Sequence, residues 1–240
     1  MNNALLFVHG SAADEDSWSI QRAFLGKQFR VVTYTRVWQG VDSYSVADHA
    51  ADAARIIGEQ DLAPAVAVGS SFGAVCVLEL ARRRPELLRG IVLCEPPLPP
   101  NDDGPLAPAT YREELERRYR EDGPRAAAEL FLRRVLGDAG FEKMPARLQE
   151  RTLGMAEQIR LDSDALNGYR VDYASLAQVT LPVLLLGGDR SGPLFEPTLA
   201  ALAAALPNAE RETLRGGSHM MHADAARQFN AVVAAFAQRV

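Results

Sequence analysis

The sequence of 240 residues predicts an α/β fold, with a mostly parallel sheet of about six strands and a helical cap inserted after the fourth strand. Short apolar runs alternate with stretches of helical periodicity over the first part of the chain, as in right-handed βαβ units. The alternation stops at Glu95, where prolines crowd the chain, and resumes at Leu181. We therefore expect a core of residues 1–96 and 181–240, with residues 97–180 inserted as a cap.

Residues 4–8 are expected to form a strand because apolar residues follow one another there with almost no alternation, which is typical of a strand covered on both faces. Further strands are expected at residues 30–35, 64–69, 90–95 and 181–186, with a last short strand at 210–214. Helices are expected where apolar residues recur every three or four positions. In the core these are a helix after Asp14 or Asp16 and the segments 45–60, 72–83, 194–206 and 224–239.

The inserted segment has a different pattern. Six prolines lie between Pro96 and Pro108, so the chain is expected to leave the sheet along an extended, non-helical path. From about residue 110 to 178 the sequence is helix-rich, most clearly at 111–120 and 125–136. Its arginines and glutamates are interpreted as paired charges on a solvated face rather than a binding patch.

Composition and charge argue against several classes of protein. A net charge of -5 with no basic stripe disfavours nucleic-acid binding. No apolar run is long enough to cross a membrane, and residues 1–9 are too short an apolar stretch for a signal peptide, so a cytoplasmic protein is expected. Lys27 and Lys143 are the only lysines and alanine is abundant, which favours a bacterial source with a GC-rich genome.

The two cysteines give no sign of a metal site. Cys76 and Cys94 lie within apolar runs and lack the spacing of metal-binding or disulfide motifs, so both are predicted to be buried, reduced thiols. Neither a metal nor a cofactor is therefore expected.

The clearest chemical signal is the Gly-x-Ser-x-Gly motif at residues 69–73, which separates an apolar run from a helical pattern. In so tight a strand-to-helix turn, a serine has a strained backbone and projects its hydroxyl from the end of the sheet. Ser71 is therefore predicted to be a nucleophile. Gly69 and Gly73 are required because a Cβ at either place would collide with the neighbouring element.

A serine nucleophile needs a base to take its proton and a buried acid to orient that base. Among the four histidines, His9 is interpreted as ordering the loop after the first strand, and His49 as a surface or interface residue. His219 follows a Gly-Gly-Ser loop after the last strand, at the edge where Ser71 should emerge, and is the predicted base. His222, at the start of the terminal helix, is the alternative.

The acid is expected at the carboxyl end of a strand between nucleophile and base. Asp189 ends its strand after two glycines and is the predicted acid, although a turn or helix-capping role would also suit it. Glu95, which ends the preceding strand before two prolines, is the alternative, unless it shapes the pocket or holds the cap.

The carbonyl oxygen that becomes negative during acyl transfer needs two backbone N–H donors, which form an oxyanion hole. One is expected from Phe72, directly after the nucleophile, and the other from the loop after the first strand, with Ser11 as first candidate. The predicted site therefore consists of Ser71, Asp189 and His219 with the N–H groups of Ser11 and Phe72.

With these motifs placed, nearly the whole chain resembles the serine α/β-hydrolase superfamily, as a small, capped, esterase-like member. The matching segments are His9-Gly10 with Trp18, the motif at 69–73, Gly187-Gly188-Asp189 and Gly217-Ser218-His219-Met220. The resemblance implies the oxyanion loop, nucleophile, acid and base at these places. It also implies six core strands without the family's N-terminal hairpin, and Ser70 stands where histidine is common.

The resemblance implies hydrolysis of a carboxylic ester, thioester or lactone through an acyl-enzyme on Ser71. A serine there argues against dehalogenases and epoxide hydrolases, which use an aspartate. The alternatives are a carbon-carbon bond hydrolase or lyase with the same triad, and a catalytically silent small-molecule binder.

The substrate is expected to be a small, largely apolar molecule bound between sheet and cap. The expected lining residues are Trp38, Phe72, Pro96, Leu98, Phe195 and Met220. No nucleic-acid or membrane partner is expected, and either a monomer or a homodimer is compatible with the sequence.

Overall fold

The computed structural model describes residues 3–102 and 109–240, without the side chains of 109 and 110. At its centre is a six-stranded sheet in the order β2-β1-β3-β4-β5-β6, in which all neighbouring strands are parallel. The strands are β1 Ala4–Val8, β2 Arg30–Tyr34, β3 Ala65–Ser70, β4 Leu88–Cys94, β5 Val183–Gly188 and β6 Ala209–Leu214. The predicted parallel sheet of six strands is thus confirmed.

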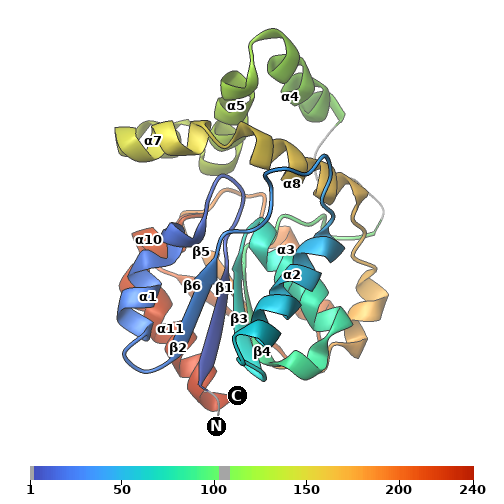
Figure 1. Cartoon of the computed structure of the whole chain (residues 1–240), viewed down its shortest axis with the longest axis vertical. Helices are drawn as coiled ribbons and strands as arrows, with labels where there is room; N and C mark the ends of the chain where they lie inside the picture. The colour runs from blue at the N-terminus through green and yellow to red at the C-terminus, as the bar shows by residue number, and fades with distance from the viewer. Residues whose placement is uncertain (1–2, 103–108) are drawn as a thin grey trace.

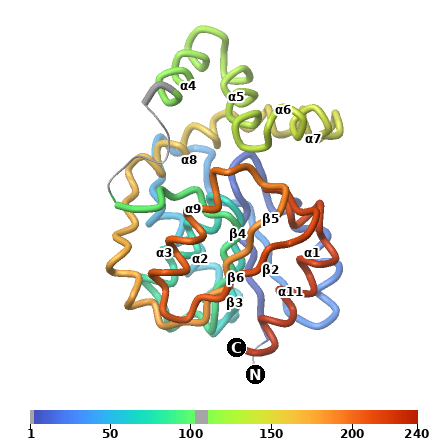
Figure 2. Tube along the Cα trace, turned by 180° about the vertical axis from the view of Figure 1, so that it is seen from behind, coloured from blue at the N-terminus to red at the C-terminus, as the bar shows by residue number. Residues whose placement is uncertain are grey.

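Helices cover both faces of the sheet (Figures 1 and 2). One face packs against α2 Val46–Glu59, α3 Phe72–Arg83 and α9 Glu196–Ala205, and the other against η1 Glu15–Trp18, α1 Ser19–Leu25 and α11 Ala226–Arg239. Strand β1 shows the result, since Leu6 and Val8 join the first core and Leu5 and Phe7 join the second. A strand buried on both faces needs apolar residues at every position, which explains its unbroken apolar sequence.

The segment between β4 and β5 is helical, as predicted, and lies over the carboxyl ends of the strands, far from both termini (Figure 1). Its elements are α4 Ala109–Glu121, α5 Pro124–Leu136, α6 Asp138–Glu142, α7 Ala146–Leu153, α8 Ala156–Gly168 and η3 Tyr173–Gln178. Many of its charges are paired along the helices, as Arg117 is with Glu114 and Glu121, each at 2.8 Å. That residues 97–180 form an inserted unit with these bounds stays a prediction, and Pro105 and Pro108 lie outside the described residues.

The sequence at the start of helix α2 caps the helix, and the helix carries His49 on its buried face. The Ser45 hydroxyl accepts the Asp48 N–H at 3.2 Å, and the Asp48 carboxylate accepts the Ser45 N–H at 2.9 Å, so two free donors at the helix start are satisfied. Val46, Ala50 and Ile57 lie on the buried face of the helix. His49 lies on this same face and points into the protein.

The structure also bears on the expectations for the two cysteines and for membrane-spanning helices. Cys76 and Cys94 are buried and unpaired, as predicted. Burial raises the pKa of the Cys76 thiol to about 12, which makes it inert as a nucleophile at neutral pH. Among the described residues, no helix combines the length and apolar character needed to cross a membrane.

Candidate active site

Strand β3 and helix α3 meet at Ser71, whose backbone is strained. Its φ of 53° and ψ of −125° lie outside the regions favoured by residues with a side chain. A Cβ at Gly69 would lie 2.4 Å from the carbonyl oxygen of Gly73, and one at Gly73 would lie 2.2 Å from that of Val8. The predicted need for both glycines is therefore confirmed.

The carboxylate that contacts His219 is that of Glu95, directly after β4. Glu95 Oε2 lies 2.7 Å from His219 Nδ1, and its Oε1 accepts the Gly188 N–H at 2.9 Å. The Glu95 and His219 side chains are only 1% and 7% exposed. Because an ionised carboxylate can only accept, Nδ1 carries the hydrogen and Nε2 is left free to take a proton.

A second contact fixes the His219 ring. Phe195 stacks on it with ring centroids 4.2 Å apart and planes inclined by 4°. Ser71 and His219 line one common cavity. The structure thus brings the predicted nucleophile and the predicted base to the same space at the carboxyl edge of the sheet.

The prediction that Asp189 is the acid partner of His219 is wrong. Asp189 is exposed, and its Oδ1 accepts the Gly216 N–H at 2.7 Å. A Cβ at Gly188 would lie 2.2 Å from the Gly217 carbonyl oxygen, so the two glycines before Asp189 allow β5 to approach the loop of His219. The Asp189 carboxylate thus binds the backbone of the loop that carries His219. Glu95, which follows the neighbouring strand β4, contacts the His219 ring.

The two predicted oxyanion donors belong to segments that lie close to Ser71. Phe72 is the first residue of α3, so its N–H has no acceptor within the helix. In the described part of the chain, the Ser11 N–H donates to no acceptor, and Ser11 lines the same cavities as Ser71. A Cβ at Gly10 would lie 3.0 Å from Ser71 Cβ, which shows how closely this loop passes the nucleophile. Their role as oxyanion donors stays a prediction.

The model of the Alpha/beta hydrolase family matches residues 5–232. The chain belongs to the alpha/beta hydrolase family. This chain is 28% identical over 205 residues to a protein of Bacillus subtilis (strain 168) described as the uncharacterized hydrolase YraK. The match covers 80% of this chain and 73% of that protein.

Solved structures show the same fold at low sequence identity. A thermophilic esterase from Thermogutta terrifontis is 22% identical with a TM-score of 0.81, over 98% of the hydrolase and 89% of the esterase. An enol-lactonase from Burkholderia xenovorans LB400 is 20% identical with a TM-score of 0.83, over 98% and 91% of the two chains. At these identities the similarity establishes the α/β-hydrolase fold alone.

Two cavities of the hydrolase meet at Ser71. The large cavity, of about 380 Å³, extends between α4, α5 and α8. Apolar residues such as Leu115 and Ile159 line it. Its other lining residues include Arg112, Arg120, Arg134 and Arg160. The small cavity, of about 260 Å³, extends toward α7 and is lined by His219, Met220 and Thr152, among others. Phe131 on α5 lines both cavities.

The expected pocket lining is correct only in part. Phe195 lines the large cavity and Met220 the small one, whereas Trp38 and Pro96 line neither. Phe72 and Leu98 are also absent from both linings and are buried in the core. Among the described residues, no cluster of three His, Cys, Asp or Glu side chains is placed to bind a metal ion.

The histidine assignments outside the site have mixed outcomes. The expectation that His49 lies at a surface is wrong, because it is 2% exposed beside Arg36 and Phe72. His9 does order its loop: its Nε2 accepts the Arg36 N–H at 2.9 Å, and its Nδ1 bonds the Gly10 carbonyl at 2.8 Å. His222 is buried against Trp18, and burial lowers its pKa to about 4.

Sequence reasoning missed the buried pair of Arg36 and Asp162. Arg36 follows β2, and Asp162 lies on α8 of the helical segment, 126 residues away. Arg36 is 1% exposed and Asp162 2% exposed, and Ser11 donates its hydroxyl to Asp162 at 2.7 Å. A solitary arginine after a strand and an aspartate within a helix carry no local pattern that would have linked them.

Proposed function

We propose that the protein hydrolyses a carboxylic ester, thioester or lactone through an acyl-enzyme on Ser71, with His219 as base and Glu95 as the acid that orients it. The observation that carries the proposal is the buried contact of 2.7 Å between Glu95 and His219, at a cavity that the strained Ser71 also lines. A serine, a histidine and a buried carboxylate are the groups that acyl transfer requires.

In the proposed first step, Ser71 Oγ attacks the carbonyl carbon of the substrate while its proton passes to His219 Nε2. The carbonyl oxygen becomes negative and is stabilised by the N–H groups of Ser11 and Phe72. The bond from the carbonyl carbon to the leaving oxygen, or to the leaving sulfur of a thioester, then breaks, and the His219 proton passes to that atom. In the second step, water attacks the acyl-enzyme while His219 takes one of its protons, and this proton passes to Ser71 Oγ as the bond to the acid breaks.

The two cavities suggest where each part of an ester lies. Because His219 must protonate the leaving oxygen, the leaving group belongs in the small cavity, which His219 lines. The acyl group then extends into the large cavity between α4, α5 and α8, whose lining does not include His219. Apolar side chains such as Leu115, Phe131 and Ile159 around the large cavity favour an apolar acyl group.

Ester cleavage is also in keeping with the solved structures of the same fold, which include proteins described as an esterase and an enol-lactonase. These resemblances add support for the reaction class.

The test is turnover of a panel of p-nitrophenyl esters together with labelling by a fluorophosphonate, using Ser71→Ala as the matched control. The proposal expects turnover and labelling by the unmodified protein and neither by Ser71→Ala. No turnover and no labelling of the unmodified protein would contradict it. Labelling of Ser71 without turnover of any ester would instead favour a lyase or a carbon-carbon bond hydrolase.

A further inference from the structure

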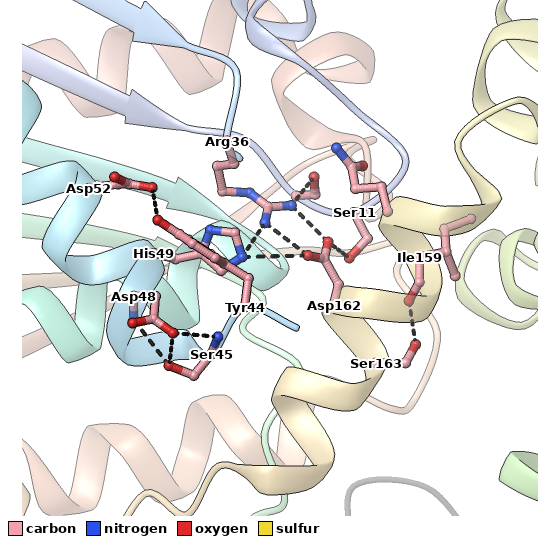
Figure 3. Close-up of polar contacts among 12 residues, drawn as sticks. Ser11, Arg36, Tyr44, Ser45, Asp48, His49, Asp52, Ile159, Asp162 and Ser163 are labelled. Carbon is pink, nitrogen blue, oxygen red and sulfur yellow. Dashed lines mark hydrogen bonds and ion pairs between the residues drawn. The ribbon is translucent and has the colours of Figure 1, made fainter. Parts of the chain in front are cut away.

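Arg36 has several hydrogen-bond partners, which converge on the loop of Ser11 (Figure 3). Its Nε donates to the His9 carbonyl at 3.0 Å, and its Nη2 donates to the Gly10 carbonyl at 3.0 Å. Its guanidinium carbon also lies 4.5 Å from the centre of the Phe72 ring. Arg36 thus contacts both segments that carry the proposed oxyanion donors.

The contact with the Gly10 carbonyl has a directional consequence. In a trans peptide the C=O and the following N–H point in opposite directions. The Gly10 carbonyl points at Arg36 and also bonds His9 Nδ1 at 2.8 Å, so the Ser11 N–H is directed away from Arg36. Because Ser11 lines both cavities beside Ser71, this orientation leaves its N–H free for a ligand.

Asp162, on helix α8, contacts both Arg36 and Ser11 (Figure 3). Its Oδ1 accepts Arg36 Nη1 at 2.9 Å, and its Oδ2 accepts both Arg36 Nη2 and the Ser11 hydroxyl at 2.7 Å. One turn earlier on α8, Gln158 exchanges two hydrogen bonds with the Ala13 backbone, at 3.1 Å and 3.0 Å. The same face of α8 therefore holds the loop at Ser11 and at Ala13.

We propose that Arg36 and Asp162 are positioning residues of the oxyanion hole, through which helix α8 sets the direction of the Ser11 N–H. The inference rests on the proposed function, because it concerns the same site. It makes the helical segment a part of the catalytic apparatus and not only a cover for the substrate. Arg36 and Asp162 do not touch the reacting atoms; they act through the Gly10–Ser11 peptide.

The neighbouring His49 leaves Asp162 as the group that compensates the charge of Arg36. His49 Nε2 lies 3.3 Å from Arg36 Nη1 and 3.9 Å from Asp162 Oδ1. Burial, together with Arg36, lowers the pKa of His49 to about 3, so the ring is neutral and accepts from Arg36. Asp162 is then the group that neutralises the buried guanidinium, and replacing either charged partner alone would leave the other uncompensated.

The experiment separates positioning from folding with a double variant. Arg36→Met combined with Asp162→Leu removes both charges together, which a folded protein tolerates better than the loss of one. Asp162→Asn is the milder single change. The matched control is Glu79→Gln, because Glu79 is also buried and its Oε2 accepts Arg82 at 2.9 Å and Tyr169 at 2.8 Å, which ties α3 to the end of the helical segment away from Ser11.

The readouts are kcat and KM on an ester that the unmodified protein turns over, thermal stability, and inhibition by a trifluoromethyl ketone. That ketone forms a negatively charged adduct with a serine and so reports on the oxyanion hole. We expect the double variant to fold and to lose roughly 10- to 100-fold in kcat, with KM nearly unchanged and inhibition weakened by a similar factor. Glu79→Gln should lose stability while keeping kcat and inhibition.

Each outcome decides a different point. A folded double variant with unchanged kcat and inhibition would overturn the positioning role. Equal losses of kcat in Glu79→Gln and in the double variant would also overturn it, since any disturbance of the helical segment would then suffice. An unmodified protein that neither turns over esters nor binds the ketone would overturn the proposed function itself.

Discussion

Glu95 and His219 are joined at the carboxyl edge of the sheet by a contact of 2.7 Å between Oε2 and Nδ1. Neither side chain is free to turn. The second carboxylate oxygen of Glu95 accepts the Gly188 N–H at 2.9 Å, and the His219 ring stacks on Phe195 at 4.2 Å. Two independent contacts therefore hold the imidazole in one orientation, with Nε2 on the side of the ring away from Glu95.

Replacing each of the two candidate carboxylates tests which one serves His219. Glu95→Gln should lower kcat/KM by roughly 10³- to 10⁴-fold, because an amide no longer stabilises the charged imidazole that forms during the reaction. Asp189→Asn should change kcat/KM less than about tenfold, since the Asp189 carboxylate accepts the Gly216 N–H of the neighbouring loop and an amide oxygen can accept it too. Steady-state kinetics on one ester compares the two variants, and a larger loss in Asp189→Asn would refute the assignment.

Filling each cavity tests where the two parts of the substrate lie. Leu115→Trp narrows the large cavity and should slow both acylation and deacylation with long acyl chains, while short acyl esters react normally. Ala223→Trp narrows the small cavity and should slow acylation by esters of bulky alcohols. Deacylation in Ala223→Trp should not depend on the size of the alcohol, because all esters of one acid give the same acyl-enzyme. The reverse pattern in pre-steady-state kinetics would exchange the two assignments.

The glycines around Ser71 predict a contrast in stability. Gly73→Ala should destabilise the protein by about 3 kcal/mol or more, because its Cβ would lie 2.2 Å from the Val8 carbonyl oxygen. Gly58 in α2 is the matched control, since a Cβ there meets nothing within 4 Å. Gly58→Ala should stabilise the protein by about 0.5 to 1 kcal/mol. Urea unfolding measures both changes, and similar effects at the two positions would contradict the packing argument.

The buried His222 predicts a loss of stability in acid. Burial lowers its pKa in the folded protein to about 4, whereas the unfolded chain binds the proton near the usual value of about 6.5. The free energy of unfolding should therefore decrease as the pH falls from about 6.5 to about 4, by about 3 kcal/mol from this residue. His222→Phe keeps a ring beside Trp18 and should flatten this slope. Unfolding curves with equal slopes in both proteins would show that His222 does not carry the effect.

Much of the fold and half of the site follow from local patterns. Strands β1, β3, β4 and β5 are largely buried on both faces, so their sequences are mostly apolar without alternation, and the glycines that Ser71 requires lie within one short motif. His219 was predictable because the loop that follows β6 must reach the same edge of the sheet as Ser71. In each case the pattern that predicts the feature lies within one short stretch of the chain.

The remaining features depend on contacts that no local pattern records. Glu95 and Asp189 follow adjacent parallel strands, so both end at the same edge, and the sequence does not show which carboxylate reaches the ring. Glu95 reaches it from a backbone with φ of 44°, which a sequence does not reveal for a residue other than glycine. The Arg36–Asp162 pair joins a loop of the core to a helix 126 residues away, and only the packed structure brings them together.

The most direct test of the central claim is intact-protein and peptide mass spectrometry after rapid acid quenching of the protein during turnover of a p-nitrophenyl ester. The account predicts an adduct with the mass of the acyl group, on the peptide that contains Ser71, that accumulates in the unmodified protein and is absent from Ser71→Ala. Turnover without such an adduct, or an adduct on another residue, would contradict the claim that Ser71 is the nucleophile.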